Sequence, residues 1–135
     1  MSGRNNNKRY ILLTAARNEE KNIEKTIKSV IGQTIKPMQW IIISDGSTDK
    51  TDEIVSLYEE KHKFIRFFRA SGDRHHNFGS KVKAINFARD QVDIKTFNYI
   101  GVIDADISFS QDYFEKLLAR FEEDQNLGIG GGIIY

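Results

Sequence analysis

Short apolar runs alternate with helical patterns along this chain, and no other feature of the sequence constrains the fold as strongly. Buried strands are predicted over residues 10–14, 40–44, 64–68, 97–103 and 127–135. Helices are predicted over residues 19–31, 49–61 and 81–91, with a fourth around the apolar stripe of Phe114, Leu117, Leu118 and Phe121. Strands that alternate with such helices are typical of βαβ units. We therefore predict an α/β fold with a mostly parallel sheet flanked by helices.

The first predicted helix has signals at both ends. Asn18 is expected to be its N-cap, and Glu19 and Glu20 place negative charge in the first turn, where the helix dipole favours it. Gly32 fits the C-terminal end. These signals predict that the helix begins at Glu19.

Composition narrows the class of protein. The 135 residues, 39% hydrophobic and 29% charged, are typical of one globular domain. The net charge of +1 gives no argument for a nucleic-acid partner. The absence of cysteine excludes disulfides and thiol catalysis. We expect the polar residues 1–8 to be disordered or cloning-derived, which leaves residues 9–135 as the domain.

No apolar run approaches the roughly 18 residues that a membrane-spanning helix needs, and the polar start is not a signal peptide. The sequence therefore predicts no transmembrane segment and a cytoplasmic protein. Attachment of a full-length form to the cytoplasmic membrane surface is left open.

Two of the predicted strands end in carboxylates. Asp104 and Asp106 follow the apolar run that ends at Ile103, and Asp45 follows the second strand. Ligands of open α/β sheets bind beyond the carboxyl ends of the strands, and hard divalent cations take oxygen ligands there. A solvated acidic loop is the alternative for Asp104 and Asp106 alone, and the second acidic strand end favours a site.

Other loops offer candidate ligand contacts. Ala15 and Ala16 are small enough for a flat ligand to approach the main chain, although an ordinary strand-to-helix turn is the alternative. Asp45 suits a hydrogen bond from a base or ribose as well as the start of an Asp-Gly turn. In the polar loop 72–81, Arg74 or Lys81 is a candidate to neutralise a diphosphate.

Several common sites lack their sequence signals. The pair His75-His76 has no third ligand at helical spacing, so a solvated loop is favoured over a metal site. The chain has no Gly-x-Gly-x-x-Gly after the first strand, no P-loop and no Gly-x-Ser-x-Gly elbow. A phosphorylation receiver would need acidic residues where Ala15 and Ala16 stand.

Together these segments resemble the nucleotide-binding half of a family 2 glycosyltransferase with the Rossmann-like A-type glycosyltransferase fold, over about residues 9–135. The segments that carry the resemblance are Ala15-Ala16-Arg17-Asn18-Glu19-Glu20, Ser29-Val30-Ile31-Gly32-Gln33-Thr34, Ile43-Ser44-Asp45-Gly46-Ser47-Thr48-Asp49, Lys81-Val82-Lys83-Ala84-Ile85-Asn86 and Asp104-Ala105-Asp106. Their order and spacing match the family, which makes the signal far more specific than any one motif.

The resemblance implies a role for each matching residue. Asp106, with Asp104, would hold Mn²⁺ or Mg²⁺ against the diphosphate of a UDP-sugar or GDP-sugar, and Asp104 would also be a nucleotide contact. The metal would act as a Lewis acid that stabilises the departing nucleoside diphosphate. Asp45 would contact the base.

The same resemblance implies that Ala15, Arg17 and Glu19 line the base and ribose. The chain departs from the family pattern at two of its positions. Ser44 replaces the first acidic residue of the second-strand motif, and Ala15 replaces a proline. Because Asp45 is retained, nucleotide binding is expected to survive.

The implied activity is that of the donor-binding portion of an inverting, metal-dependent glycosyltransferase of the hexosyltransferase type. The acceptor, a glycan, lipid or protein, is unknown, as is the catalytic base, which lies well after the Asp-x-Asp motif in the family. Acidic residues of the last helix are expected to be solvated instead; they are Asp112, Glu115, Glu122 and Glu123.

We therefore expect a fragment of a longer enzyme, with self-association through an apolar face left by the missing half. A non-catalytic α/β module that binds a nucleotide or a protein partner is the alternative. A sugar-nucleotide pyrophosphorylase would need a glycine-rich, basic signature after the first strand, which this chain lacks.

Overall fold

The computed structural model describes residues 9–70, 78–92 and 97–123, so the predicted last strand and Arg74 lie outside the described residues. The elements are β1 (Tyr10–Ala16), α1 (Ile23–Ile31), β2 (Gln39–Asp45), α2 (Thr51–Lys61), β3 (Ile65–Ala70), α3 (Phe78–Asp90), β4 (Tyr99–Val102) and α4 (Tyr113–Glu123). Strands and helices alternate, which confirms the predicted α/β class.

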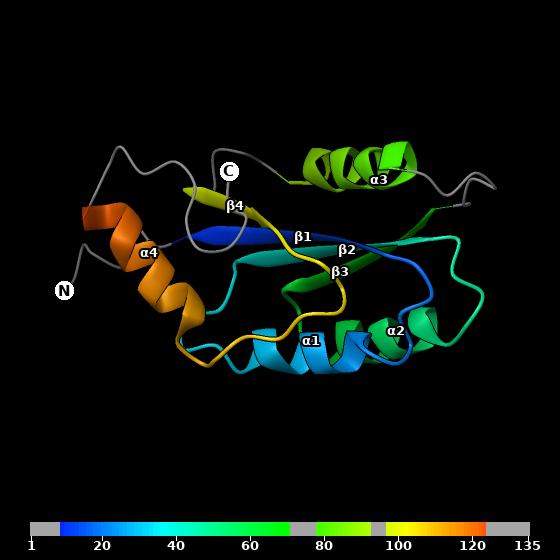
Figure 1. The fold of residues 1–135 in the computed structure, drawn as a ribbon, viewed down its shortest axis with the longest axis horizontal. Coiled ribbons are helices and arrows are strands. Elements are labelled where there is room, and N and C mark those ends of the chain that lie inside the picture. The colour runs from blue at the N-terminus through cyan, green and yellow to red at the C-terminus, as the bar shows by residue number, and fades with distance from the viewer. Residues whose placement is uncertain (1–8, 71–77, 93–96, 124–135) are drawn as a thin grey trace.

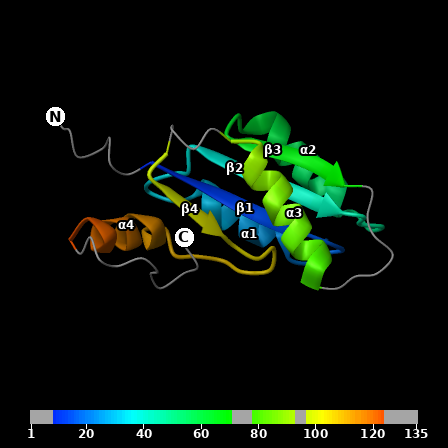
Figure 2. The same ribbon diagram turned by 90° about the horizontal axis from the view of Figure 1, so that it is seen from above.

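The strands form one parallel sheet in the order β3-β2-β1-β4. The strand order reverses at β1, because the chain passes from β1 to β2 on one side and later returns to β4 on the other. Helices α1 and α2 lie below the sheet in Figure 1, and α3 lies above it. Figure 2 shows α3 crossing over the strands. Such a reversal is where doubly wound sheets bind ligands, at the carboxyl ends of the strands.

The sheet is buried on both faces, so successive residues of a strand enter different cores. Leu12 and Ile42 pack against α1, α2 and α4. Leu13 and Ile41 pack against α3, together with Ala84 of that helix. This two-sided burial explains why the strands read as continuous apolar runs. Each fully buried side chain of this kind contributes roughly 1.5–3 kcal/mol.

Helix α4 covers the amino ends of β1 and β4. The ring of Phe114 stacks on that of Tyr10 with centroids 5.0 Å apart, and Phe121 stacks on Tyr99 at 5.1 Å. The predicted apolar stripe of α4 is confirmed as a buried face. Burial also raises the pKa of Tyr10, whose hydroxyl donates to the carbonyl oxygen of Ile35 at 2.6 Å.

The predicted start of the first helix is wrong. Helix α1 begins at Ile23 with Asn22 at the N-cap, rather than at Glu19 with Asn18 as the cap. Asn18 instead has a φ of 51°, in the left-handed region. The physical reason is that residues 18–20 donate their main-chain N–H groups to side chains of the loop after β2 and of the first residue of α2. Gly32 does occupy the C-cap of α1, as predicted.

Other boundaries move by a few residues. Helix α2 begins at Thr51, two residues later than predicted, and α3 begins at Phe78, three residues earlier. Strand β4 ends at Val102, although the N–H of Ile103 still donates to the carbonyl oxygen of Leu13 at 3.0 Å. Within the described ranges, no helix has the length and apolar character needed to cross a membrane.

Candidate functional site

Three segments meet at the carboxyl edge of the sheet, the edge at which the strands end. Two of them, which we call the paired loops, are residues 17–22 after β1 and residues 45–50, which begin at the last residue of β2. The third, the β4 segment, is residues 103–112 between β4 and α4. Because β1 lies between β2 and β4, the acidic ends of β2 and β4 flank the end of β1.

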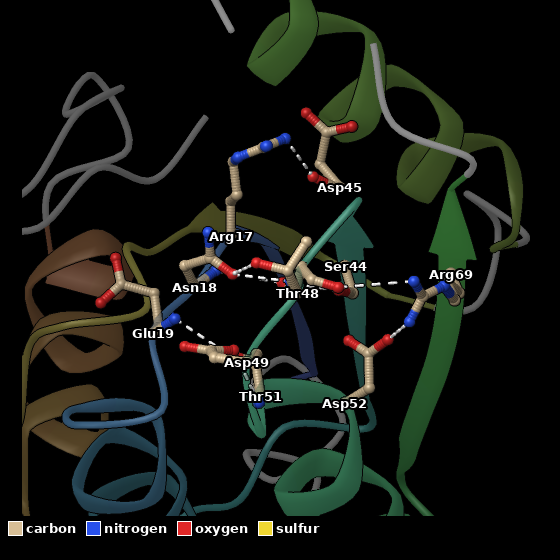
Figure 3. Close-up of polar contacts among 11 residues, drawn as sticks. Arg17, Asn18, Glu19, Ser44, Asp45, Thr48, Asp49, Thr51, Asp52 and Arg69 are labelled. Carbon is tan, nitrogen blue, oxygen red and sulfur yellow. Dashed lines mark hydrogen bonds and ion pairs between the residues drawn. The ribbon is translucent and has the colours of Figure 1, made fainter. Parts of the chain in front are cut away.

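Consecutive residues of the first loop bond to the second loop (Figure 3). Nη1 of Arg17 donates to the main-chain oxygen of Asp45 at 2.9 Å. The N–H of Asn18 donates to Oγ of Ser47 at 3.1 Å, and Oδ1 of Asn18 accepts from the N–H of Thr48 at 2.8 Å. Arg17 and Asp45, both predicted site residues, are therefore in direct contact.

The bonding continues to the start of α2. The N–H of Glu19 donates to Oγ1 of Thr51 at 2.8 Å, and that of Glu20 donates to Oδ2 of Asp49 at 3.1 Å. In return, Oε1 of Glu20 accepts from the N–H of Lys50 at 2.9 Å. These bonds occupy main-chain donors that would otherwise need water.

Asp49 is held as a carboxylate. Burial raises the pKa of Asp49, but hydrogen bonds from the hydroxyl and N–H of Thr51 and from the N–H of Glu20 outweigh this and lower it below the ordinary value of 3.8. The Thr51 bonds measure 2.5 and 2.9 Å. A carboxylate accepts such bonds best when it is ionised.

Ser44, the departure from the family motif, faces inward. Its side chain is fully buried, and its hydroxyl donates to Oγ of Ser47 at 2.9 Å. Ser44 therefore supports the turn that contains Gly46, which has a φ of 70°. Ala15 is half-buried at the end of β1 and packs against the α3-facing core.

The two aspartates of the β4 segment flank a buried alanine. Ala105 is buried, and its carbonyl oxygen accepts from the hydroxyl of Thr26 in α1 at 2.9 Å. Asp104 and Asp106 on either side are exposed. Exposure therefore alternates along residues 104–106, with Ala105 held inward and an exposed aspartate on either side of it.

Gln33, just after α1, anchors the far end of the same segment. Its amide is buried, and Nε2 donates to the carbonyl oxygens of Ser110 at 2.6 Å and Ser29 at 3.0 Å. Its Oε1 accepts from the N–H of Phe114 at 3.1 Å. Together with Thr26, Gln33 fixes the β4 segment along α1.

The donor set of the aspartates suits a hard cation. Both side chains of Asp104 and Asp106 offer oxygen, which Mg²⁺ and Mn²⁺ prefer. Within residues 9–70, 78–92 and 97–123, no group of three or more His, Cys, Asp or Glu side chains gathers as a metal site. A cation at this pair would therefore need further oxygen ligands, such as the phosphates of a substrate.

The structure brings most of the predicted site residues to the carboxyl edge. Arg17, Glu19 and Asp45 lie in the paired loops, and Asp104 and Asp106 lie in the β4 segment. Lys81 falls within α3, but its side chain is outside the described part, as is the whole of Arg74. The roles assigned to these residues stay predictions.

Sequence reasoning missed the residues that hold the site in shape. Asn18 was predicted to be a helix cap, and no role was predicted for Thr26, which lies in α1. Gln33 was noted only as part of a family motif. A polar residue at a helix end gives no local signal of burial, and family likeness was the one indication available for Gln33.

Comparison with known proteins decides the family. The family model described as glycosyl transferase family 2 matches residues 12–135. The chain belongs to this family. Among curated proteins, it is 32% identical over 116 residues to the poly-β-1,6-N-acetyl-D-glucosamine synthase of Staphylococcus aureus, a match that covers 86% of this chain. It is 30% identical over 121 residues to an uncharacterized glycosyltransferase of Methanocaldococcus jannaschii, covering 88% of this chain.

The chain spans only 26% and 39% of the length of these two relatives. Among solved structures, S. aureus TarS matches with a TM-score of 0.70 and 22% identity, over 85% of this chain and 20% of TarS. A mannosyltransferase of Pyrobaculum calidifontis, in complex with GDP-Man and Mn²⁺, matches with a TM-score of 0.61 and 22% identity, over 75% of this chain and 28% of the other. These likenesses confirm the predicted Rossmann-like, A-type glycosyltransferase fold.

Proposed function

We propose that this chain forms the donor-binding part of a metal-dependent, inverting glycosyltransferase that uses a UDP-sugar or a GDP-sugar. The observation that carries the proposal is the geometry of the carboxyl edge in a family 2 member. Asp104 and Asp106 are exposed on either side of the fixed Ala105, and Asp45 lies at the end of β2 across β1.

The similar proteins support a nucleotide-sugar donor. TarS has been solved in complex with UDP-GlcNAc, and the P. calidifontis mannosyltransferase with GDP-Man and Mn²⁺. The S. aureus relative at 32% identity is named for a polymer of N-acetyl-D-glucosamine. UDP-GlcNAc is therefore the first donor to test, with GDP-mannose as the second.

In this proposal the two sides of the carboxyl edge bind different parts of the donor. Asp45, whose main chain is held by Arg17, would accept a hydrogen bond from the base or ribose. Asp104 and Asp106 would hold the divalent cation that binds the diphosphate. When bound, that cation supplies Lewis-acid stabilisation of the leaving nucleoside diphosphate.

Charge predicts that donor binding depends on the cation. Asp104, Asp106 and a diphosphate are all negative, and like charges that approach within a few ångströms repel unless something neutralises them. Without a divalent cation, the pair would therefore oppose the donor. With the cation, the same carboxylates become ligands.

We assign no catalytic base within the described residues. Glu115 accepts a hydrogen bond from the hydroxyl of Thr34 at 2.6 Å, and Asp112 pairs with Lys116 at 3.0 Å, so both are used within the segment around the start of α4. We propose that the carboxylate that activates the acceptor corresponds to a residue in the part of the relatives that lies outside the matched segment.

The proposal is tested by release of UDP from UDP-GlcNAc and of GDP from GDP-mannose, each with Mn²⁺ and with EDTA. Slow, Mn²⁺-dependent release from one donor is expected, and Asp104→Asn should abolish it. Asp112→Asn, which changes a carboxylate at the far end of the same segment, is the matched control and should retain it. Release that is equally fast with EDTA or in Asp104→Asn would contradict the proposal, and a chain that binds neither donor nor nucleotide would do so as well.

A further inference from the structure

Asn18 has an unusual main-chain conformation for a residue other than glycine. Its φ of 51° lies in the left-handed region, where it is the only non-glycine residue among those that the structure describes. Asparagine tolerates this region better than most residues, but the conformation persists only where surrounding contacts impose it. The contacts of Asn18 therefore indicate what the conformation serves.

Those contacts are reciprocal. The N–H of Asn18 donates to Oγ of Ser47, and Oδ1 of the same residue accepts from the N–H of Thr48. The left-handed turn points both groups of Asn18 at neighbouring residues of the second loop. Glycine would adopt the same φ but has no side-chain acceptor. Alanine lacks the acceptor and also disfavours this φ.

Asn18 also lies between two further bonds across the loops. Arg17 before it donates to the main-chain oxygen of Asp45, and Glu19 after it donates its N–H to Thr51. Figure 3 shows these contacts following one another from the top of the site to the start of α2. A change in the path of the chain at Asn18 would therefore move the guanidinium of Arg17 relative to Asp45.

We infer that Asn18 is a positioning residue for the donor site. It sets the separation of the two loops, and so the place of Asp45, without being required to touch the ligand itself. This inference rests on the proposed function, because Asp45 matters only if a nucleotide binds at the carboxyl edge.

The test compares Asn18→Gly with the unaltered 135-residue chain in calorimetric titrations of UDP and GDP with Mn²⁺. Glycine keeps the left-handed conformation and removes only the side-chain acceptor. One such hydrogen bond predicts an affinity lower by about fivefold. Amide hydrogen exchange should also become faster at Thr48, while the cores of β1 and β2 stay protected.

Asn98→Gly is the matched control. Oδ1 of Asn98 accepts from the N–H of Arg9 at 3.3 Å at the amino end of the sheet, so the same substitution removes the same type of bond far from the site. It should leave nucleotide affinity unchanged. Asn18→Asp retains an acceptor oxygen and should restore slow exchange at Thr48, which keeps the inference testable if Asn18→Gly folds poorly.

The outcomes separate the two proposals. If the unaltered chain binds neither nucleotide, the proposed function fails and this inference fails with it. If the unaltered chain binds but Asn18→Gly binds equally well, only the positioning role is overturned. Equal losses in Asn18→Gly and Asn98→Gly, or fast Thr48 exchange in Asn18→Asp, would also overturn it.

Discussion

The paired loops bond mainly to each other, whereas the β4 segment bonds to the helix beneath it. In the paired loops, the side chains of Asn18 and Asp49 are themselves partners in the bonding, as is that of Thr51 at the start of α2. Thr26 and Gln33, by contrast, hold only main-chain groups of the β4 segment and of the start of α4. Asp104 and Asp106 thus keep their exposed positions.

One edge of the sheet therefore meets two different requirements, those of a nucleoside and those of a cation. A flat base and ribose need donors and acceptors at fixed places, and a bonded framework supplies these at little cost in ordering on binding. A cation needs carboxylates that reach it while the main chain stays in place. Substitutions in the paired loops should therefore change the shape of the nucleoside site. Substitutions of Asp104 or Asp106 should change only the charge that is available to the cation.

The largest loss of stability is expected when Gln33, which anchors the β4 segment, is replaced. Gln33→Ala removes the three bonds of the buried amide and leaves the N–H of Phe114 without its acceptor. At about 1 kcal/mol for each bond, the loss is about 3 kcal/mol of unfolding free energy. Thermal denaturation should show a melting temperature lower by about 10 °C.

Gln91→Ala is the control for that prediction. Gln91, one residue after α3, donates a side-chain bond to the carbonyl oxygen of Phe87 at 3.2 Å, which is its one side-chain bond among the described residues. The loss of unfolding free energy in Gln91→Ala should be well under half of that in Gln33→Ala. Similar shifts for the two variants would show that Gln33 does not anchor the segment.

A smaller effect is expected where α1 holds Ala105. Thr26→Val keeps the shape of the buried side chain but leaves the carbonyl oxygen of Ala105 without the hydroxyl. Stability should fall by about 1–2 kcal/mol, and Mn²⁺-dependent nucleotide affinity by about fivefold as the aspartates shift. Thr26→Ser keeps the hydroxyl and should retain the affinity. An unchanged affinity in Thr26→Val would show that the bond to Ala105 does not position Asp104 and Asp106 for the cation.

The paired loops should respond to pH through Asp49. The lowered pKa means that the ionised carboxylate stabilises the fold; this contribution is present above 3.8, the ordinary value, and is lost as the pH falls through the lowered one. Asp49→Asn should therefore be less stable than the parent by about 1 kcal/mol near neutral pH. The gap should narrow in urea titrations at acidic pH. A gap that widens there would contradict the assignment.

The smallest effect is expected at the surface of the β4 segment. Hydrogen bonding and charge from Lys116 lower the pKa of Asp112, but both side chains are largely exposed. Exposed pairs one helical turn apart contribute little and are screened by salt. Lys116→Gln should leave the melting temperature unchanged within error. A clear shift would mean that the surface pair, rather than Gln33, holds this segment.

The sequence predicts the architecture well because strands buried on both faces leave long apolar runs. The runs at 40–44 and 10–14 match β2 and β1 closely, and the stripe from Phe114 to Phe121 matches α4. The strand ends also place Asp45, Asp104 and Asp106 correctly at one edge. Both results follow from local pattern and the geometry of parallel sheets.

The predictions fail where bonds join distant residues. Asn18 and Glu19 carry good local signals for a helix start, but bonds to Ser47, Thr48 and Thr51 override them. Such contacts join residues about thirty positions apart, and a local pattern cannot contain them. Gln33 shows the same limit, because its partners, Ser110 in the β4 segment and Phe114 in α4, are far along the chain.

The metal-dependent donor site is tested most directly by a calorimetric titration of UDP and GDP into the unaltered chain and into Asp106→Asn, with and without Mn²⁺. We expect one nucleotide to bind only with Mn²⁺, and Asp106→Asn to lose this binding while its melting temperature is unchanged. Asp112→Asn, the matched control, should bind as the parent does. Binding that is equally tight without Mn²⁺ or in Asp106→Asn would contradict the claim that the carboxylates of the β4 segment hold a cation against the donor.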